Sequence, residues 1–122
     1  MSNKKTILVV DDSITTRDYI SSFLKEAGYE TRQAANGTLA LDIINGNTFD
    51  CYIIDLLMPE MNGLELLEKL RELQDKTPTI VVTADIQEEV KNECLNLGAR
   101  DFINKPIINP EVILTSINKA IN

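Results

Sequence analysis

The chain has 122 residues, 43% of them hydrophobic, and its 12 basic and 19 acidic side chains give a net charge of -7. This length suits one ordinary domain with a core of its own. The negative charge argues against binding to nucleic acid or to an anionic membrane, and no apolar run approaches the roughly 18 residues that span a bilayer. We therefore expect a single domain over residues 1–122, with no effector domain.

Two residue types narrow the chemistry further. The sequence contains no histidine, which excludes a Ser-His-Asp triad, a Cys-His pair and imidazole metal ligands. Carboxylates or lysine would have to act as any general base, and phosphohistidine chemistry would need a histidine on a different protein. Cys51 and Cys94 lack metal-like spacing, and the polar N-terminus lacks the apolar stretch of a secretory signal. We expect two free thiols and a cytoplasmic protein.

The first half of the chain alternates between apolar runs and helical patterns. A continuous β-branched run predicts a strand covered on both faces, and apolar residues at helical spacing followed by glycine predict a helix that ends there. The expected elements are, in order, a strand at 6–10, a helix from Ser13 to Ala27, a more polar edge strand at 29–34, a short helix that follows the Asn36-Gly37 turn and reaches Ile44, and a strand at 51–54.

The second half continues the same alternation. Asn109 followed by Pro110 is a strong helix start, because an N-cap side chain precedes proline at the first helical position. The expected elements are a helix marked by Leu64, Leu67, Leu70 and Leu73, a strand at 79–83, a helix lined by Ile86, Val90 and Leu97 that ends at Gly98, a strand at 101–104, and a helix from Pro110 to Ile121. Five strands alternating with five helices predict an α/β fold of (βα)5 type, a doubly wound parallel sheet with helices on both faces.

Polar residues follow four of the predicted strands. The first strand ends at Asp11 and Asp12, the third at Asp55 and the fourth at Thr83, and the fifth leads to Lys105. In an open parallel α/β sheet, ligands bind at the carboxyl ends of the strands. The sequence therefore places three carboxylates, a hydroxyl and an ammonium along one edge of the sheet.

Each of these residues also has a purely structural interpretation, but such interpretations do not explain why the residues coincide at one edge of the sheet. The structural interpretations are that Asp12 or Ser13 caps the first helix, that Thr83 is an ordinary strand residue, that Lys105 is a solvated surface lysine, and that Asp85 with Glu88 forms a capping box.

Electrostatics favours a bound cation at this edge. Two carboxylates that lie 4 Å apart repel by about 4 kcal/mol at an effective dielectric of 20. Lys105 can neutralise one charge, and the remainder favours a hard divalent cation such as Mg²⁺. A cation, a lysine and a hydroxyl together form a site for a phosphoryl group, which one of the acids could accept as a nucleophile. Asp55 is the best candidate, because the third strand should be central.

Four ordered motifs resemble one known family. They are VVDDS at 9–13, IIDLLMPEMNG at 53–63, VVTAD at 81–85 and FINKPI at 102–107. The chain is similar over its whole length to the CheY-like receiver domain of response regulators, the phosphoacceptor module of two-component signal transduction. The resemblance implies a flavodoxin-like fold with strand order 2-1-3-4-5.

The resemblance also implies roles for the polar edge. Asp55 would be the phosphoacceptor and would take a phosphoryl group from a sensor histidine kinase or a histidine phosphotransfer protein. Asp12, Asp55 and the backbone carbonyl of Leu57 would bind Mg²⁺, Asp11 would hold a water on the metal, and Lys105 would contact the phosphoryl oxygens. Leu57 stands at a position that is often polar in the family, which would alter how water or a phosphatase reaches the acyl phosphate.

Two further residues would transmit the signal. The resemblance implies that Thr83 moves to bond the phosphoryl group and that Phe102 occupies the aromatic switch position, where many relatives have tyrosine. It also implies a cis peptide bond between Lys105 and Pro106. The face from the fourth helix to the fifth helix would then bind an unknown output protein or a second copy of the chain.

We expect a stand-alone receiver that promotes only its own phosphorylation and dephosphorylation, in chemotaxis-type signalling or in a phosphorelay. The main alternative is a phosphatase of haloacid-dehalogenase type, which needs a second acid two residues after its nucleophile, where this chain has Leu57. A flavodoxin-like FMN carrier would need a phosphate-binding loop after the first strand, and this chain has none. A binding module that works without phosphorylation would be expected to lose a site residue, and all of them are present.

Overall fold

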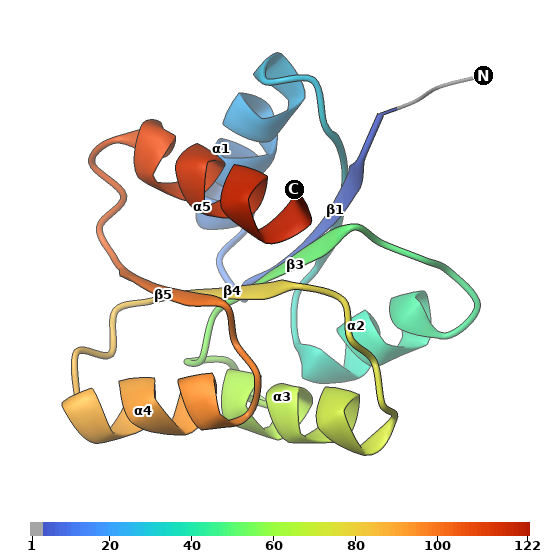
Figure 1. The fold of residues 1–122 in the computed structure, drawn as a ribbon, viewed down its shortest axis with the longest axis vertical. Coiled ribbons are helices and arrows are strands. Elements are labelled where there is room, and N and C mark those ends of the chain that lie inside the picture. Colours follow the sequence, from blue (N-terminus) through green and yellow to red (C-terminus); the bar gives the residue numbers. More distant parts are fainter. Residues whose placement is uncertain (1–3) are drawn as a thin grey trace.

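Five parallel strands form one sheet in the order β2-β1-β3-β4-β5, and five helices cover its two faces (Figure 1). The computed structural model describes residues 4–122. The elements are β1 (Thr6–Val10), α1 (Ile14–Glu26), β2 (Glu30–Ala34), α2 (Gly37–Ile44), β3 (Cys51–Ile54), α3 (Gly63–Glu72), β4 (Thr79–Thr83), α4 (Glu88–Asn96), β5 (Asp101–Asn104) and α5 (Pro110–Ile121).

The strand register confirms the predicted flavodoxin-like topology. Ile7 of β1 pairs with Thr31 of β2 on one side and with Cys51 of β3 on the other, so β1 lies inside the sheet and β2 at its edge. All four residues of β3 are buried, as expected of a strand between two neighbours and two helix layers. The sheet thus brings the carboxyl ends of β1, β3 and β4 next to one another.

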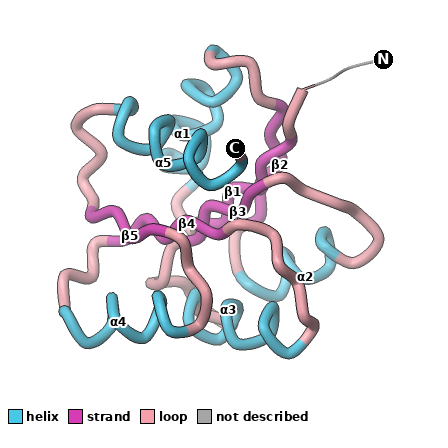
Figure 2. The backbone as a smooth tube through the Cα atoms, in the orientation of Figure 1, coloured by secondary structure: helices cyan, strands magenta, loops and turns pink. Residues whose placement is uncertain are grey.

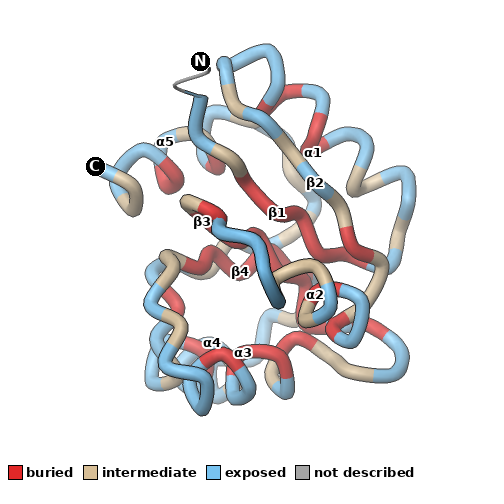
Figure 3. Tube along the Cα trace, turned by 90° about the vertical axis from the view of Figure 1, so that its right-hand side faces the viewer, coloured by how far each residue is buried: buried red, intermediate tan, exposed pale blue. Residues whose placement is uncertain are grey.

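The sheet divides the apolar core into two clusters. Because successive side chains of a strand point to opposite faces, Ile7 and Val9 pack in the cluster under α1 and α5, whereas Leu8 and Val10 pack in the cluster above α2, α3 and α4. The strands lie between these two helix layers (Figure 2). Buried residues are concentrated along β1 and β4 and on the inner sides of the helices (Figure 3).

Helix starts follow the side-chain capping rules at four of the five helices. A side-chain oxygen of the N-cap residue accepts a hydrogen bond from a backbone N–H of the first turn. This satisfies one of the N–H groups that have no partner within the helix. At α3, Glu65 also bonds back to the N-cap backbone, which completes a capping box with Asn62. The four N-caps are Ser13, Asn36, Asn62 and Asn109. The capping interpretation of Ser13 is therefore correct, and Asp12 is left free of that role.

The fourth helix differs from the prediction. Its N-cap is Gln87, which makes no side-chain cap, and the predicted capping box of Asp85 with Glu88 is wrong. The Asp85 carboxylate instead accepts a hydrogen bond from the Gln87 N–H at 3.0 Å, which closes a turn directly after β4. Because of this turn, α4 begins only at Glu88. Ile86 therefore precedes the helix and is 78% exposed instead of lining its core face.

Two other element ends differ by one residue. Tyr29 lies outside both α1 and β2, and its N–H donates to the Leu24 carbonyl across Gly28, whose φ is +99°, which closes the end of α1. The second strand therefore begins at Glu30. Leu73 caps the end of α3 and is 64% exposed, so it does not extend the buried stripe of that helix.

Both cysteines are buried and free, as predicted. Burial raises the pKa of the Cys51 thiol to about 12 and that of the Cys94 thiol to about 11. Each is therefore a neutral thiol at neutral pH and behaves as a small apolar side chain. Within residues 4–122, no helix has both the length and the apolar character needed to cross a membrane.

Candidate functional site

Three carboxylates meet where β1 and β3 end. Asp11 and Asp12 follow Val10 of β1, and Asp55 follows Ile54 of β3. One carboxylate oxygen from each of the three lies within 4.8 Å of the others. Asp11 and Asp55 are buried, whereas Asp12 is exposed. The geometry thus gathers the three acids that the sequence places at this edge.

Lys105 lies between two of these acids. Its Nζ atom is 2.7 Å from Asp11 Oδ2 and 3.1 Å from Asp55 Oδ2, and its side chain is 20% exposed. Burial acts to lower the pKa of Lys105, but the hydrogen bond to Asp11 and the charge of Asp55 outweigh it, so the net shift is upward. The lysine is a charged partner of the cluster, and its interpretation as a solvated surface residue is wrong.

The remaining oxygens of the buried acids bond to backbone groups. Asp11 Oδ1 accepts from the Ser13 N–H at 2.9 Å, and Asp55 Oδ1 accepts from the Leu57 N–H at 3.3 Å. Among residues 4–122, the Asp12 carboxylate has no hydrogen-bond or ion-pair partner. One acid of the cluster therefore keeps its oxygens available to a ligand.

Thr83 ends β4 at the same edge of the sheet. It is fully buried, and its Oγ1 accepts a hydrogen bond from the Asp85 N–H at 3.3 Å. Its carbonyl accepts from the Lys105 N–H at 2.8 Å, so the hydroxyl and the lysine lie on adjacent strand ends joined by a backbone hydrogen bond. The peptide bond between Lys105 and Pro106 is cis, as the resemblance implies.

Phe102 lies outside the acid cluster. It pairs with Val81 of β4, two residues before Thr83, and is half-buried. It packs against the same apolar cluster as Val90 and Leu97 of the α4 region. The Phe102 ring therefore packs on the face of the sheet that α4 covers, next to the strand that ends at Thr83.

Two glycines hold the loop after β3 close to the site, and the sequence indicated only that Gly37 lies in a turn and Gly63 in a loop. A Cβ atom at Gly63 would lie 2.4 Å from the Asp55 carbonyl oxygen and 2.7 Å from Leu56 Cα. A Cβ atom at Gly37 would lie 2.7 Å from the Met61 carbonyl oxygen. Both positions need glycine for close approach of backbone to backbone, a requirement that only the folded loop reveals.

Arg17 and Gln33 were also missed. The Arg17 guanidinium donates to the Asp11 carbonyl oxygen at 2.7 Å and to Gln33 Oε1 at 3.0 Å. The only sequence signal is that Arg17 stands one helical turn inside α1, close behind the acidic pair. Gln33 gives no signal, because its contact with α1 depends on how β2 packs beside that helix.

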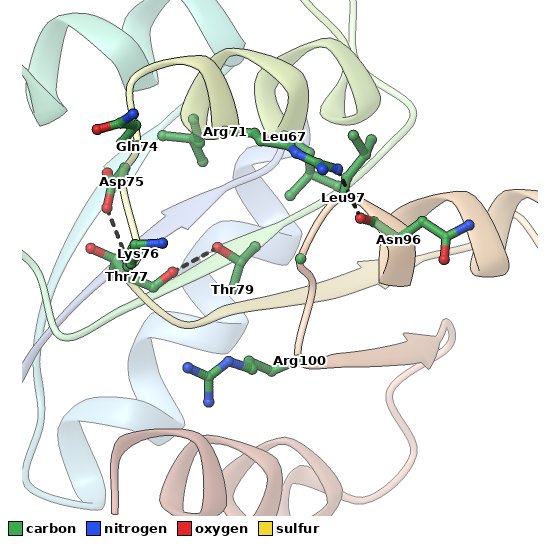
Figure 4. A pocket seen from close by; sticks show the side chains of 12 residues that line it. Leu67, Arg71, Gln74, Asp75, Lys76, Thr77, Thr79, Asn96, Leu97 and Arg100 are labelled. Carbon is green, nitrogen blue, oxygen red and sulfur yellow. Dashed lines mark hydrogen bonds between the residues drawn. The ribbon is translucent and has the colours of Figure 1, made fainter.

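A second cleft, of about 450 Å³, lies at the opposite edge of the sheet, beside the start of β4 (Figure 4). Arg71, Lys76 and Arg100 contribute cations to its lining. In Figure 4 the Arg71 guanidinium reaches the Asn96 carbonyl, at 3.0 Å, whereas that of Arg100 points away from it. The cations do not converge on one point, so the acid cluster is the stronger candidate site.

The acid cluster suits a hard divalent cation. Three carboxylates and one lysine leave an excess of negative charge, and the atoms available are oxygens, the ligands that Mg²⁺ prefers. The unpartnered Asp12 carboxylate is the natural first ligand. The residues present therefore fit a magnesium ion.

Comparison with known proteins identifies the family. The model of the response regulator receiver domain matches residues 7–118. The transcriptional regulatory protein SrrA of Staphylococcus aureus is 38% identical over 114 residues, which are 93% of this chain. The chain spans 46% of the length of that relative.

Solved structures agree with the sequence match. The receiver domain of Francisella response regulator 1452 has a TM-score of 0.91 and 32% identity, with 97% of each chain covered. The chemotaxis protein CheY4 of Vibrio cholerae has a TM-score of 0.89 and 35% identity, with 96% of this chain and 98% of that chain covered. The chain belongs to the response regulator receiver domain family of two-component signalling.

Proposed function

We propose that Asp55 is the phosphoacceptor of this receiver domain and takes a phosphoryl group from a phosphohistidine with Mg²⁺ bound at the acid cluster. The observation that carries the proposal is the contact of Lys105 Nζ with both Asp11 and Asp55, at 2.7 and 3.1 Å, beside the unpartnered Asp12. A buried carboxylate with a cation at one side and a metal site at the other is prepared to approach an anionic donor.

The transfer itself is a simple displacement. An Asp55 oxygen forms a bond to phosphorus while the N–P bond of the donor breaks, and the electron pair of that bond returns to the imidazole nitrogen. The imidazole leaves as a neutral group when its other ring nitrogen carries a proton. Magnesium, when bound, offsets the charge of the phosphoryl oxygens.

Other residues of the chain stabilise the phosphoryl group. Lys105 can turn from the Asp55 oxygen to a phosphoryl oxygen without leaving Asp11. The Thr83 hydroxyl accepts from the Asp85 N–H through its oxygen, so its own O–H can donate to the phosphoryl group. Asp12, Asp55 and the Leu57 carbonyl would hold the metal, and Asp11 would orient a water molecule beside it.

The phosphohistidine donor lies outside this chain. Receiver domains interact with histidine kinases or phosphotransfer proteins, and this chain has no histidine of its own. The output follows from protein contact at the face formed by α4, β5 and α5, with either a partner protein or a second copy. Relatives include a chemotaxis protein and a transcriptional regulatory protein, and we propose that this chain acts as a receiver in chemotaxis-type signalling or in a phosphorelay.

The test of the proposal is chemical phosphorylation. Incubation with acetyl phosphate and Mg²⁺ should add one phosphoryl mass to the intact protein, and Asp55→Asn should abolish the addition. The matched control is Asp42→Asn, which removes an exposed acid of α2 outside the cluster and should react normally. EDTA should block the reaction of the wild type. Full labelling of Asp55→Asn would place the nucleophile elsewhere.

The metal site has its own test. Asp12→Ala should weaken Mg²⁺ binding, measured by titration calorimetry, by at least about tenfold, since it removes the unpartnered ligand. The free energy of unfolding without metal should not fall, because the substitution also relieves repulsion among three acids. Unchanged Mg²⁺ affinity would remove Asp12 from the ligand set.

A further inference from the structure

The peptide group between Asp11 and Asp12 is held from both sides. The Asp11 N–H donates to the Ala34 carbonyl of β2 at 3.1 Å. The Asp11 carbonyl accepts from Arg17 Nη1 at 2.7 Å. Because this carbonyl belongs to the peptide bond that precedes Asp12, its orientation decides where the Asp12 side chain begins.

Arg17 is itself fixed in place. It lies in the first turn of α1, where its N–H donates to the Ser13 carbonyl at 2.9 Å, and it is half-buried. Its Nε donates to Gln33 Oε1 at 3.0 Å. A guanidinium that bonds through two different nitrogens has little rotational freedom left.

Gln33 is oriented in turn by two groups of α1. Its Nε2 donates to Ser21 Oγ at 3.1 Å and to Asp18 Oδ1 at 3.2 Å. A flipped amide would turn its NH₂ group toward the Arg17 Nε–H and its oxygen toward the Asp18 carboxylate, so these contacts fix its orientation. The chain of contacts thus runs from buried Ser21 through Gln33 and Arg17 to the Asp11 carbonyl.

We propose that Arg17 is a positioning residue of the metal site, which orients the Asp11–Asp12 peptide so that Asp12 presents its carboxylate to the cation, and that Gln33 holds Arg17 in that position. The inference rests on the proposed function, because it assigns the positioning to a metal that the phosphoacceptor site uses. It concerns a residue that touches neither the metal nor the phosphoryl group.

The direction of the change in Mg²⁺ affinity distinguishes a positioning role of Arg17 from an effect of its charge. Arg17 carries a positive charge close to three carboxylates, so its removal would strengthen the attraction of the site for Mg²⁺ if charge alone mattered. Loss of a group that orients a ligand acts in the opposite direction and typically weakens metal affinity by about 10-fold to 100-fold. The two explanations therefore predict opposite changes in the dissociation constant.

The experiment measures Mg²⁺ affinity of four variants by titration calorimetry. Arg17→Met should weaken binding by about tenfold or more, whereas Arg17→Lys, which keeps the charge and one donor, should recover part of the loss. Gln33→Met, which leaves Arg17 charged and in the chain, should weaken binding by about threefold. The matched control is Arg32→Met, which removes an exposed arginine next to Gln33 on the same strand and should bind as tightly as the wild type or slightly more tightly.

A second measurement needs no metal. In the metal-free protein, the Arg17 Nε–H should give a protected signal in nitrogen-15 NMR, and Gln33→Met should abolish that protection while the amide spectrum remains that of a folded protein. Thermal unfolding of each variant shows whether a weak binder is folded at the temperature of the titration.

The outcomes distinguish this inference from the proposed function. If the wild type binds Mg²⁺ and is phosphorylated but Arg17→Met binds as tightly as the wild type, the positioning role is overturned and the phosphoacceptor proposal stands. If the wild type neither binds Mg²⁺ nor reacts with acetyl phosphate, the proposed function fails first. A loss in Arg32→Met equal to that in Arg17→Met would also overturn the inference, since the loss would then not depend on the contact of Arg17 with the Asp11 carbonyl.

Discussion

Lys105 and Asp11 form a 2.7 Å ion pair although 94 residues separate them in the chain. The contact joins the end of β5 to the end of β1 across the width of β3 and β4. It is shorter than the contact of the same lysine with Asp55, at 3.1 Å. In the metal-free protein the lysine is thus held mainly by Asp11, which leaves Asp55 the less tightly bound of the two buried acids.

Removal of this lysine should destabilise the metal-free protein. Lys105→Met leaves Asp11 and Asp55 without their cation, and we expect the free energy of unfolding at neutral pH to fall by about 2–3 kcal/mol. The pKa of Lys105 is raised above the ordinary value of 10.5. The stability that it contributes is therefore fully present below pH 10.5 and is lost as the pH rises through the higher pKa of the folded state.

Urea unfolding of the wild type and of Lys105→Met over a range of pH checks this prediction. The difference between the two proteins should be constant near neutral pH and should shrink above about pH 10.5. Lys119→Met, which removes an exposed lysine of α5, serves as the control and should change stability little. A difference that stays constant into strong alkali would contradict the ion-pair explanation.

Thr83→Ala should separate phosphorylation from signalling. The nucleophile, the acids and Lys105 are unchanged, so acetyl phosphate should still label the protein. The amide shifts of α4 and β5 should respond less to BeF₃⁻, a phosphoryl mimic, because the hydroxyl that reports the phosphoryl group is missing. Thr79→Ala, at the other end of β4, is the control for a lost threonine. An undiminished response would take Thr83 out of the coupling.

Phe102 should act through packing, because its ring carries no hydroxyl. If Thr83 moves toward the phosphoryl group, it vacates space on the α4 side of the sheet, and the ring can turn into that space. Phe102→Tyr should therefore be tolerated, whereas Phe102→Ala should weaken phosphorylation-dependent association by at least about tenfold, measured by sedimentation with and without BeF₃⁻ or by binding to the output partner. Crosslinks of the phosphorylated protein that map only to α1 and α2 would place the output surface elsewhere.

The hydrogen bond between Tyr52 and Asp75 should make the stability of the protein depend on pH in the acid range. The Tyr52 hydroxyl donates to Asp75 Oδ2 at 2.5 Å. Burial acts to raise the pKa of Asp75, but the hydrogen bonds from Tyr52 and Thr77 outweigh it and hold the pKa below the ordinary value of 3.8. The stability from this carboxylate is present above pH 3.8 and is lost as the pH falls through the lower pKa of the folded state.

Tyr52→Phe keeps the buried ring and removes only the donor. We expect a loss of about 1–2 kcal/mol at neutral pH in urea unfolding, and a smaller difference from the wild type below about pH 3.8. Tyr29→Phe is the matched control, since the Tyr29 hydroxyl makes no hydrogen bond within residues 4–122. An equal loss in both variants would show that the Asp75 hydrogen bond is not the cause.

The polar edge of the sheet was predictable because it follows from topology alone. Once the alternation of strands and helices indicates a parallel sheet, the residues after each strand must share one edge, which is where Asp11, Asp55, Thr83 and Lys105 lie. Electrostatics then requires a cation among the acids, and Lys105 supplies it. The strand order rested on the family resemblance, because periodicity carries no information on which strands are neighbours.

The parts that were missed depend on contacts that no sequence pattern reports. The start of α4 was placed too early because the side chain of Asp85 can cap a helix or close a turn, and the sequence does not say which. Arg17 meets Gln33 only after β2 packs beside α1. Gly63 looks like an ordinary loop glycine until α3 lies against the backbone of Asp55.

The division of the core into two clusters has a consequence for how the protein tolerates change. Ile7 and Val9 belong to one cluster and Leu8 and Val10 to the other. Alternate residues of this single strand therefore pack against different helix layers. A graft that replaces α1 and α5 with those of a relative needs compensation at only every second strand position. The layer of α2, α3 and α4, with Phe102 packed against it, keeps its own partners in such a hybrid.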